Sequence, residues 1–419
     1  MQQSLKHQIG DRAAQIAKSL ADARQAMGLP RPSFEKVGEW QLTALHCYED
    51  TLRAADSPAE TLTAEKGDQA ELGRGAECWK ARPGLIKFAA AQPLAAAYRA
   101  TGDQRYARTF RNLVEDFWAS LTAPKWAGGG MRLSSRINNW ARFMPYFFDS
   151  ECMDDEFVQR MVDSIAEQLD SILATHQVRH RGNIRLLETN GIFWCGICLP
   201  MLDKAEACLA RARWVYADTA RRDIGPDGSH VEHDPNYHEV YQGTFYNLMV
   251  WRRAFPEAQL PDVTDVALWV FDYAVATRRP NGHCCGIQES SSAWVGGKDI
   301  TPFLNKRAQV RRLAGLPEEP PPLTLHCHDA GQVFMRDGWG RDDSYVVFDA
   351  SRWGGAHSHL ARNGVQIFAN GRALLADTGA LTYAMDNKAK EGDEFDHQVG
   401  PYGKSTRAHN TLTLNGWNQ

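Results

Sequence analysis

Two histidines stand one residue apart in the stretch WGGAHSHLARNG. They are His357 and His359, and the chain later carries Asp377 in LLADTG and His409 in STRAHNTLTLNG. Imidazole exchanges protons near neutral pH, and both imidazole and carboxylate groups bind zinc. Side chains two positions apart on a strand face the same side, whereas in a loop they need not. These residues could therefore form a metal site, a catalytic site, or no common site.

Two further segments gather polar side chains. PDGSHVEHDPNYHEVYQ holds three histidines within nine residues, and its Pro, Gly and Asp residues predict a loop between helices. Loops on a rigid scaffold often carry binding and catalytic residues. The polar residues of this segment are His230, Glu232, His233, Tyr237 and His238. The other segment, RHRGNIRLLETNG, holds His180, Asn183, Glu188 and Asn190.

The scaffold before these segments reads as a succession of amphipathic helices from about residue 4 to 315. Apolar residues recur at helical spacing, and Gly and Pro separate the stripes. No GxGxxG follows a strand and no alternation of strand and helix occurs, so we expect a helical bundle or an (α/α) toroid. The stripes are Tyr106, Phe110, Leu113, Phe117 and Leu121; Phe157, Met161, Ile165, Leu169 and Ile172; and Tyr241, Phe245, Leu248 and Trp251.

The sequence pattern changes after the proline-rich segment GLPEEPPPLTL, which predicts a linker. Strand patterns follow, and Asn370-Gly371 between two apolar stretches predicts a hairpin. We therefore expect a helical domain over 1–315, a linker over 316–324 and an antiparallel β-domain over 325–419. Asn415-Gly416 predicts another turn only three residues before the last residue. A turn needs a returning strand, so we expect that the β-domain is cut short or that the chain is a fragment.

The amino-acid composition narrows the class of protein only a little. The 419 residues are 43% hydrophobic and 23% charged, as in ordinary globular proteins, and the formal net charge is -4. That balance gives no reason to expect a nucleic-acid or membrane partner. The first twenty residues lack the apolar core of a signal peptide, which favours a cytoplasmic location. Cys195 and Cys198 form a CxxC in an apolar run without a second pair, so we expect buried thiols.

The segments GGAHSHLARNGVQIFANGRALLADTG and STRAHNTLTLNG, together with GNIRLLETNG and DGSHVEHDPNYHEVY upstream, resemble the motifs of heparinase II/III-like polysaccharide lyases. The resemblance runs from about Gly75 to the last residue with the motifs in the family's order. It implies an α+β multidomain fold, an incomplete (α/α) toroid followed by an antiparallel β-sandwich that is truncated here. It also implies elimination on acidic polysaccharides that contain uronic acids, such as heparan sulfate and alginate.

Such chemistry makes three demands. The enzyme must neutralise the uronate carboxylate, remove the C5 proton, and protonate the leaving O4. Asn, His and Arg suit the first task, and a phenol can remove one proton and return another. A free tyrosine has a pKa of about 10, so a neighbouring cation or imidazole must help it ionise.

The resemblance assigns these tasks to particular residues. Tyr237 is expected to be the base and also the acid, with Tyr241 one helical turn on as the alternative. Asn183 matches the asparagine that binds the carboxylate, with Asn190 as second choice. Many relatives carry His directly after that asparagine, whereas this chain has Ile184, which favours Tyr237 acting alone.

Further roles follow from the same resemblance. His357 matches an active-site histidine that faces the substrate, and His238 could either orient its neighbours or take part in chemistry. Glu188 follows Asn183 at the family's spacing. In SSRINNWARF, Arg136 and Asn139 resemble a helical segment that lines the cleft, although a surface or interhelix arginine fits the pattern equally well.

The resemblance also implies a metal. In relatives the second histidine, a later aspartate and the histidine of the HN pair bind zinc; these are His359, Asp377 and His409 here. Two imidazoles, a carboxylate and a water can form a tetrahedral zinc site, which we expect to be structural. Polar residues bonded to one another without a metal remain the alternative. No organic cofactor is expected, and nothing predicts the oligomeric state.

Two other functions stay open. A glycoside hydrolase on the same scaffold would need two carboxylates across the bond, such as Glu232 with Asp234, or Glu188 with Glu239. A carbohydrate-binding protein without activity would need none of this chemistry. The absence of HExxH argues against a metalloprotease.

Overall fold

The computed structural model describes residues 3–30, 86–119, 130–176, 180–290, 299–352, 355, 357–380 and 401–419. They divide into two compact units. Unit 1 holds the described residues of 1–179, 187–215 and 253–259, and unit 2 holds those of 180–186, 216–252 and 260–419. No helix in the described ranges has both the length and the apolar character needed to cross a membrane.

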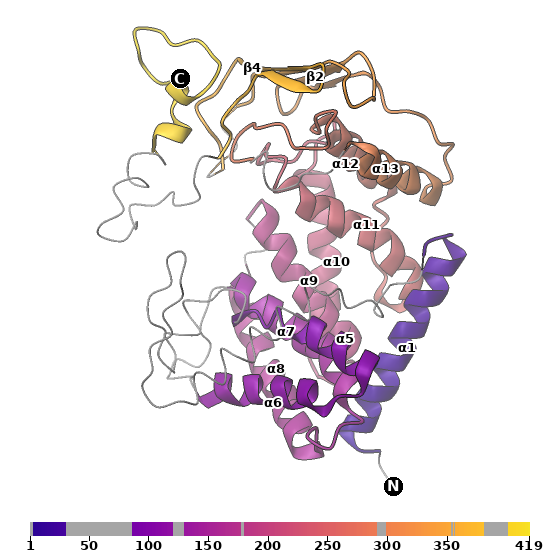
Figure 1. The fold of residues 1–419 in the computed structure, drawn as a ribbon. Coiled ribbons are helices and arrows are strands. Elements are labelled where there is room, and N and C mark those ends of the chain that lie inside the picture. Colours follow the sequence, from indigo (N-terminus) through magenta and orange to yellow (C-terminus); the bar gives the residue numbers. More distant parts are fainter. Residues whose placement is uncertain are drawn as a thin grey trace. The chain divides into compact units, whose positions relative to one another are not determined.

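Unit 1 is helical (Figure 1). α1 packs against α8 and η1, and α7 packs against α8. Its elements are α1 (Leu5–Ala26), α5 (Ala91–Thr101), α6 (Gln104–Ala119), α7 (Gly130–Phe143), η1 (Met144–Phe147), α8 (Asp155–Thr175), most of α9 (Asn183–Cys198), the first part of α10 (Ala205–Arg222), and η2 (Pro256–Ala258).

The helical stripes expected in this unit are confirmed. Four described apolar residues of α6 and five of α8 at the expected spacing are buried, which gives each helix one face in the core. Leu121 lies outside the described residues. The Asp154 side chain accepts a hydrogen bond from the Phe157 N–H at 2.8 Å, which caps the start of α8. Cys195 and Cys198 are buried and free, as expected.

Unit 2 combines helices with one antiparallel sheet. The helices are the end of α10, most of α11 (His238–Ala254), α12 (Thr264–Ala276) and α13 (Thr301–Leu313), and a single turn, η3 (Thr406–Ala408), lies near the end of the chain. The strands are β1 (Thr324–Cys327), β2 (Gln332–Arg336), β3 (Tyr345–Asp349), β4 (Gly364–Ala369) and β5 (Arg372–Leu375). They pair in sequence order, so the sheet is a meander.

The predicted hairpin joins β4 to β5. Asn370 and Gly371 have φ angles of 51° and 71°, the positive values that a two-residue type I′ turn requires. Asn415 and Gly416 also have positive φ, and a bridge pairs the residues on either side, Leu414 and Trp417. Both turns predicted from Asn-Gly pairs are therefore confirmed.

One face of the sheet packs on α12. Tyr273 of α12 meets the ring of Phe334 edge-on at 5.8 Å, and its hydroxyl donates to Gln332 Oε1 at 2.7 Å. Strand residues with alternate positions buried, including Tyr345 and Phe368, complete this core. Figure 1 shows α12 and α13 next to the sheet. The segment after α12, which carries site residues, is thus anchored between helix and sheet.

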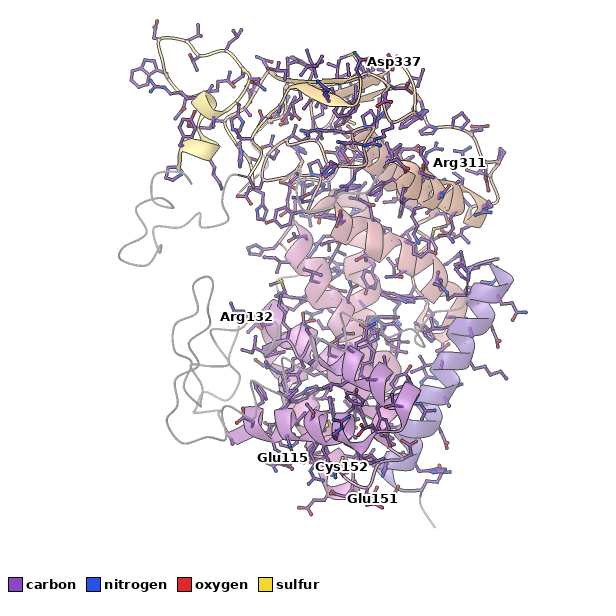
Figure 2. All side chains as sticks on the ribbon, in the orientation of Figure 1. Glu115, Arg132, Glu151, Cys152, Arg311 and Asp337 are labelled. Carbon is purple, nitrogen blue, oxygen red and sulfur yellow. The ribbon has the colours of Figure 1, made fainter. Side chains whose placement is uncertain are left out.

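The change from helix to strand falls where the sequence predicts it. α13 ends at Leu313 and β1 begins at Thr324. Arg311, labelled in Figure 2, donates to the Pro317 carbonyl at 2.8 Å and pairs with Glu319 at 3.0 Å, which holds the intervening segment on α13. The α+β class is confirmed. The domain limits at 315 and 325, the closure of the helices into a toroid and the second sheet of a sandwich stay predictions.

Candidate active site

The loop predicted between two helices occupies residues 223–237, between α10 and α11. Its backbone is closed on itself: the Val231 N–H donates to the Asp223 carbonyl at 3.0 Å, and the Gly225 N–H to the Ser229 carbonyl at 2.9 Å. Ile224 and His230 form an antiparallel bridge. These bonds give the loop a defined shape, so it can present a side chain at its end.

Tyr237 is that last loop residue, directly before α11, and it is partly exposed. Asp234 fixes its backbone, because the carboxylate Oδ1 accepts from the N–H groups of Asn236 at 2.8 Å and Tyr237 at 3.2 Å. The Ser290 hydroxyl donates to the same oxygen at 2.9 Å. Asp234 is completely buried, and this burial raises the pKa of its carboxyl to about 8.

The imidazole of His357 lies on the ring of Tyr237. The ring centroids are 3.8 Å apart and the planes differ by 28°. The His357 Nδ1 is 2.5 Å from Glu289 Oε2, and the Nε2 is 3.8 Å from Glu232 Oε1. Glu289 is almost fully buried, and its second oxygen pairs with Lys404 Nζ at 2.8 Å. A chain of contacts therefore runs from Lys404 through Glu289 and His357 to Tyr237.

Opposite charges shift the pKa values of His357 and Glu289 in this series of contacts. Burial alone would lower the pKa of His357, but the hydrogen bond and charge of Glu289, with Glu232 beside it, raise that pKa above its ordinary value. Burial would raise the pKa of Glu289, but His357 and Lys404 outweigh it and lower that pKa. Both shifts favour the charged forms, so the Glu289 carboxylate lies between Lys404 and an imidazole whose protonation is favoured, and that imidazole touches the phenol ring of Tyr237.

Asn183 is connected to the same group of residues. It is the first residue of α9, and its N–H donates to Glu232 Oε2 at 3.2 Å. Burial raises the pKa of Glu232, although His357 opposes that shift. Glu232 therefore lies between the backbone of Asn183 and the ring of His357. The structure thus brings together Tyr237, His357 and Asn183, which sequence reasoning singled out.

Two residues assigned to the site are core residues instead. His238 is fully buried, with Nε2 2.8 Å from the Val270 carbonyl and Nδ1 3.3 Å from His230 Nδ1; burial lowers its pKa to about 4. Tyr241 is fully buried, and burial raises the pKa of its hydroxyl well above 10. Neither side chain can reach a substrate here, so direct roles for His238 in chemistry and for Tyr241 as base or binding residue are not supported.

Four other expected site residues belong to unit 1. Arg136 is fully buried; its guanidinium donates to Gln168 at 2.6 Å and to the Ile86 carbonyl at 3.2 Å, and burial lowers its pKa to about 9. This contact between two helices matches the alternative of an interhelix arginine, and the expected contact of Arg136 with a substrate stays a prediction. The Asn139 side chain donates to the Lys87 carbonyl at 2.8 Å.

The remaining two of these four lie on α9. Glu188 is buried, with its carboxylate 3.8 Å from His176 Nε2. Asn190 is partly exposed two residues further along the helix. Their expected contacts with a substrate stay predictions.

The three residues expected to bind zinc are neighbours. The His409 Nδ1 lies 2.9 and 3.1 Å from the two Asp377 oxygens, and the ring centroids of His359 and His409 are 5.2 Å apart. Both ring nitrogens of His359 and the Nε2 of His409 are buried without a hydrogen-bond partner in the described part of the chain. Burial lowers the pKa of His359 to about 4, so its imidazole is neutral.

Donor types and unpartnered nitrogens of this kind fit zinc. The ligand atoms do not yet converge, because the described residues contain no group of three or more His, Cys, Asp or Glu side chains already arranged for a metal ion.

Sequence reasoning missed three residues that position the site, Glu289, Lys404 and Ser290, and considered Asp234 only as a carboxylate of a hydrolase. Glu289 and Ser290 belong to the irregular segment CGIQESSS, and Lys404 belongs to YGKSTRAHN. A single acidic or basic residue in irregular sequence is usually solvated, so nothing marks it in advance. Asp234 carries the one usable signal, because an Asp three residues before a tyrosine at a helix start is typical of a capping turn.

Family models match both parts of the chain. The heparinase II/III N-terminus model matches residues 81–263, and the heparinase II/III-like C-terminal model matches residues 319–419. The chain belongs to the heparinase II/III-like family.

Individual relatives agree with this family. A heparin-sulfate lyase of Bacteroides thetaiotaomicron is 23% identical over 357 residues, which cover 77% of this chain and 50% of the relative. A heparin-sulfate lyase of Pedobacter heparinus is 23% identical over 351 residues, which cover 78% of this chain and 51% of the relative. The chain thus spans about half the length of these curated relatives.

Solved structures share the fold. A crystal structure of heparinase III matches with a TM-score of 0.67 and 16% identity, over 96% of this chain and 63% of that one. Heparan sulfate lyase HepC from Pedobacter heparinus matches with a TM-score of 0.65 and 19% identity, over 97% of this chain and 66% of that one. These matches support the arrangement of a helical part followed by an antiparallel sheet.

Proposed function

We propose that this chain carries the catalytic site of a polysaccharide lyase that cleaves uronic-acid-containing chains by β-elimination. Tyr237 acts as the base on the C5 proton and as the acid toward the leaving O4. The observation that carries the proposal is the contact between Tyr237 and His357, with ring centroids 3.8 Å apart. A phenol that is partly open to solvent and touches a cationic imidazole can lose its proton more easily.

The surrounding charges are compatible with an acidic substrate. Glu289 is compensated by His357 and Lys404, and burial favours the neutral forms of Asp234 and Glu232. The carboxylates of the site therefore repel a polyanion less than their number suggests. His357 supplies positive charge and Asn183 amide hydrogens for the uronate carboxylate, whose negative charge grows as the C5 proton leaves.

The hydrolase is less well supported. It needs two carboxylates that reach the scissile bond from either side. Of the pair Glu232 and Asp234, Asp234 is completely buried and already accepts three hydrogen bonds. Glu239, from the other pair, is exposed and bonded to Arg278 at 2.9 Å. Elimination by a tyrosine requires no such pair.

The substrate class follows from the relatives. Two of them are heparin-sulfate lyases, so heparan-sulfate-type glycosaminoglycan is the first substrate to test. Alginate and other uronate polymers present the same C5 proton and leaving group. We further propose that His359, Asp377 and His409 hold a structural zinc ion, which would supply no step of the elimination.

One assay separates these functions. Elimination leaves a C4=C5 double bond conjugated with the carboxylate, which absorbs ultraviolet light, whereas hydrolysis makes reducing ends without that double bond. The chain should be assayed on heparan sulfate, heparin and alginate oligosaccharides, with both products followed together. A rise in absorbance on any of them supports the lyase. New reducing ends without absorbance would replace it by a hydrolase, and binding without either product would leave a carbohydrate-binding protein.

A further inference from the structure

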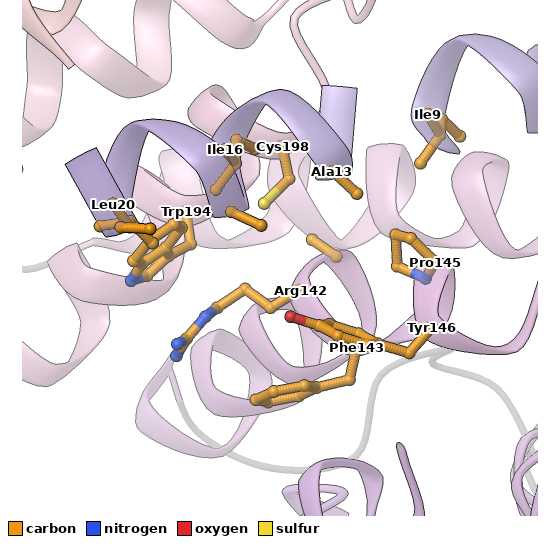
Figure 3. A pocket seen from close by; sticks show the side chains of 13 residues that line it. Ile9, Ala13, Ile16, Leu20, Arg142, Phe143, Pro145, Tyr146, Trp194 and Cys198 are labelled. Atoms are coloured by element: carbon orange, nitrogen blue, oxygen red, sulfur yellow. The ribbon is translucent and has the colours of Figure 1, made fainter. Parts of the chain in front are cut away.

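A cavity of about 300 Å³ lies within unit 1, and none of the candidate site residues lines it. One wall is α1, whose small side chains Ala13 and Ala17 leave room beside larger apolar residues. Trp194 and Cys198 of α9 form another wall (Figure 3). The end of α7 and η1 close it with Arg142 and Tyr146. Apart from these two side chains the lining is almost entirely apolar.

Arg142 is the unusual member of this lining. Its guanidinium lies 4.4 Å from the ring centroid of Trp194 and 5.1 Å from that of Phe143, so two aromatic rings flank the cation, as Figure 3 shows. Within the described ranges no carboxylate forms an ion pair with it, and none of its N–H groups makes a hydrogen bond. Burial lowers its pKa, as expected for a cation removed from water without a counter-charge.

Three other arginines of unit 1 and unit 2 with little exposure have hydrogen-bond acceptors among the described residues. Arg185 bonds to Asp218 at 2.8 Å and to Asp223 at 3.1 Å, and Arg136 bonds to Gln168. Arg12, which belongs to the α1 helix that lines the cavity, donates to the Ile197 carbonyl at 2.9 Å and to Glu257 at 3.1 Å. Arg142 is partly buried beside this apolar cavity, and the described residues supply its guanidinium with no acceptor, which points to an acceptor that comes from a ligand.

We infer that this cavity binds a small amphiphilic monoanion, a carboxylate carried on an unbranched apolar chain. The planar fork of Arg142 matches a carboxylate, and Trp194 and Phe143 hold the fork in place. The apolar chain lies along the α1 wall, where Ala13 and Ala17 leave space. A sulfated or uronate sugar does not fit this site, because its hydroxyl groups would face alanine, isoleucine and leucine without partners.

The inference does not depend on the proposed function, and its test requires no enzymatic assay. Octanoate would be titrated into the whole chain by calorimetry, with octanol and octylamine as probes of equal length and different charge. Octanoate should bind saturably at a single site. Octanol should bind about 10- to 100-fold more weakly, as for loss of a charge-assisted hydrogen bond, and octylamine should not bind.

Two variants separate charge from shape. Arg142→Met keeps an apolar stem of similar length and removes an unpaired cation, so the melting temperature should stay equal or rise. The affinity of this variant for octanoate should fall to that for octanol. Ala17→Phe keeps Arg142 but fills the cavity, so both octanoate and octanol should lose binding. If either variant fails to fold, the comparison of octanoate with octanol on the unaltered chain still shows whether the cavity prefers an anion.

Three results would overturn the inference. Octanoate and octanol binding equally would leave an apolar cavity without an anion site. Octanoate binding unchanged in Arg142→Met would place the anion elsewhere. Absence of octanoate binding, with Arg142→Met strongly destabilised, would assign Arg142 to aromatic packing alone.

Discussion

The imidazole of His357 stacks on the phenol ring of Tyr237, although 120 residues separate them in the sequence. Three separate contacts maintain this pair. Asp234 fixes the backbone of Tyr237, Glu289 holds the His357 Nδ1, and Lys404 holds Glu289. The cation beside the phenol is therefore built by residues of several segments, and each of them can be tested.

Replacing Tyr237 by Phe should remove elimination activity. The ring and its contact with His357 stay, but the group that moves the proton is lost, so we expect a fall of about 100- to 10,000-fold in kcat. The measurement is the ultraviolet absorbance of the unsaturated product on the best uronate substrate. Substrate binding, followed by calorimetry, should remain.

Tyr241→Phe is the matched control for this variant. Its hydroxyl is fully buried and has no hydrogen-bond partner within the described residues, so its removal strands no other group. Activity should stay within a factor of about two, because the Tyr241 hydroxyl is outside any substrate path. If Tyr241→Phe were inactive and Tyr237→Phe active, the base would be Tyr241.

Glu289→Gln should lower the rate through His357. The carboxylate is 2.5 Å from His357 Nδ1 and 2.8 Å from Lys404 Nζ, and the variant removes its negative charge from both contacts, while Glu232 stays 3.8 Å from His357 Nε2. Loss of one charge-assisted hydrogen bond predicts a fall of about 10- to 100-fold in kcat, with a smaller change in KM. Glu239→Gln removes an exposed partner of Arg278 and should change neither value. An equal fall in both variants would indicate a general loss of stability instead.

The helices and the hairpin could be predicted because each is a local property. The stripe from Tyr106 to Phe117 has a helical period, and Asn370-Gly371 meets the backbone demand of its turn by residue type alone. The same reasoning explains the error at Tyr241. It shares the apolar stripe of α11 with Phe245, which marks the inward face, so its burial was already indicated by the sequence.

The supporting residues of the site could not be predicted in this way. Glu289 meets His357 and Lys404 only after three segments that are distant in the sequence have folded together, and no period or spacing in the sequence expresses that meeting. The two readings of Arg136 stayed open for a related reason. Its position on a helix is clear, but whether it faces solvent or Gln168 of another helix depends on the packing of that second helix.

Asp234 predicts how stability changes with pH. Its pKa is raised from an ordinary 3.8 to about 8 in the folded chain, so the folded state holds a proton that the unfolded state releases. Between these two pKa values the unfolded state binds fewer protons than the folded state. The contribution of Asp234 to the free energy of unfolding therefore falls as pH rises, by at most about 1.4 kcal/mol per pH unit.

Asp234→Asn tests this dependence. The amide oxygen can still accept from Asn236, Tyr237 and Ser290, and the side chain no longer titrates. Relative to the unaltered chain, the variant should gain stability steadily from about pH 4 to pH 8. Chemical denaturation across this range measures it. A difference that stays constant with pH would show that Asp234 is already ionised in the folded chain.

Zinc should stabilise the β-sheet part of unit 2. His359, Asp377 and His409 supply the ligands, and we expect about one zinc ion per chain by elemental analysis. A chelator should lower the melting temperature, and His409→Ala should lower it equally and remove the chelator's effect. His7→Ala, at an exposed position on α1, should leave both zinc content and melting temperature unchanged. Stability that is indifferent to chelator and zinc would leave a hydrogen-bonded cluster without metal.

Gly228 should be indispensable for the loop that ends at Tyr237. Its φ is +80°, and a Cβ at this position would lie 2.0 Å from the Trp269 carbonyl oxygen of α12. Gly228→Ala must therefore move backbone on one side or the other, and we expect a loss of more than about 3 kcal/mol in the free energy of unfolding. Gly102→Ala is the control, since Gly102 has a φ of +68° with nothing within 4 Å.

The difference between these two glycine variants isolates the contact with α12. Gly102→Ala should cost only the strain of a left-handed residue, about 1 to 2 kcal/mol, and leave elimination unchanged. Gly228→Ala should lower activity as well, because the loop that places Tyr237 against His357 rests on Trp269. Chemical denaturation measures the free energy of unfolding of both variants, and the absorbance assay measures their elimination activity. Equal costs in stability together with full activity would show that the loop can move away from α12 without disturbing the Tyr237 and His357 pair.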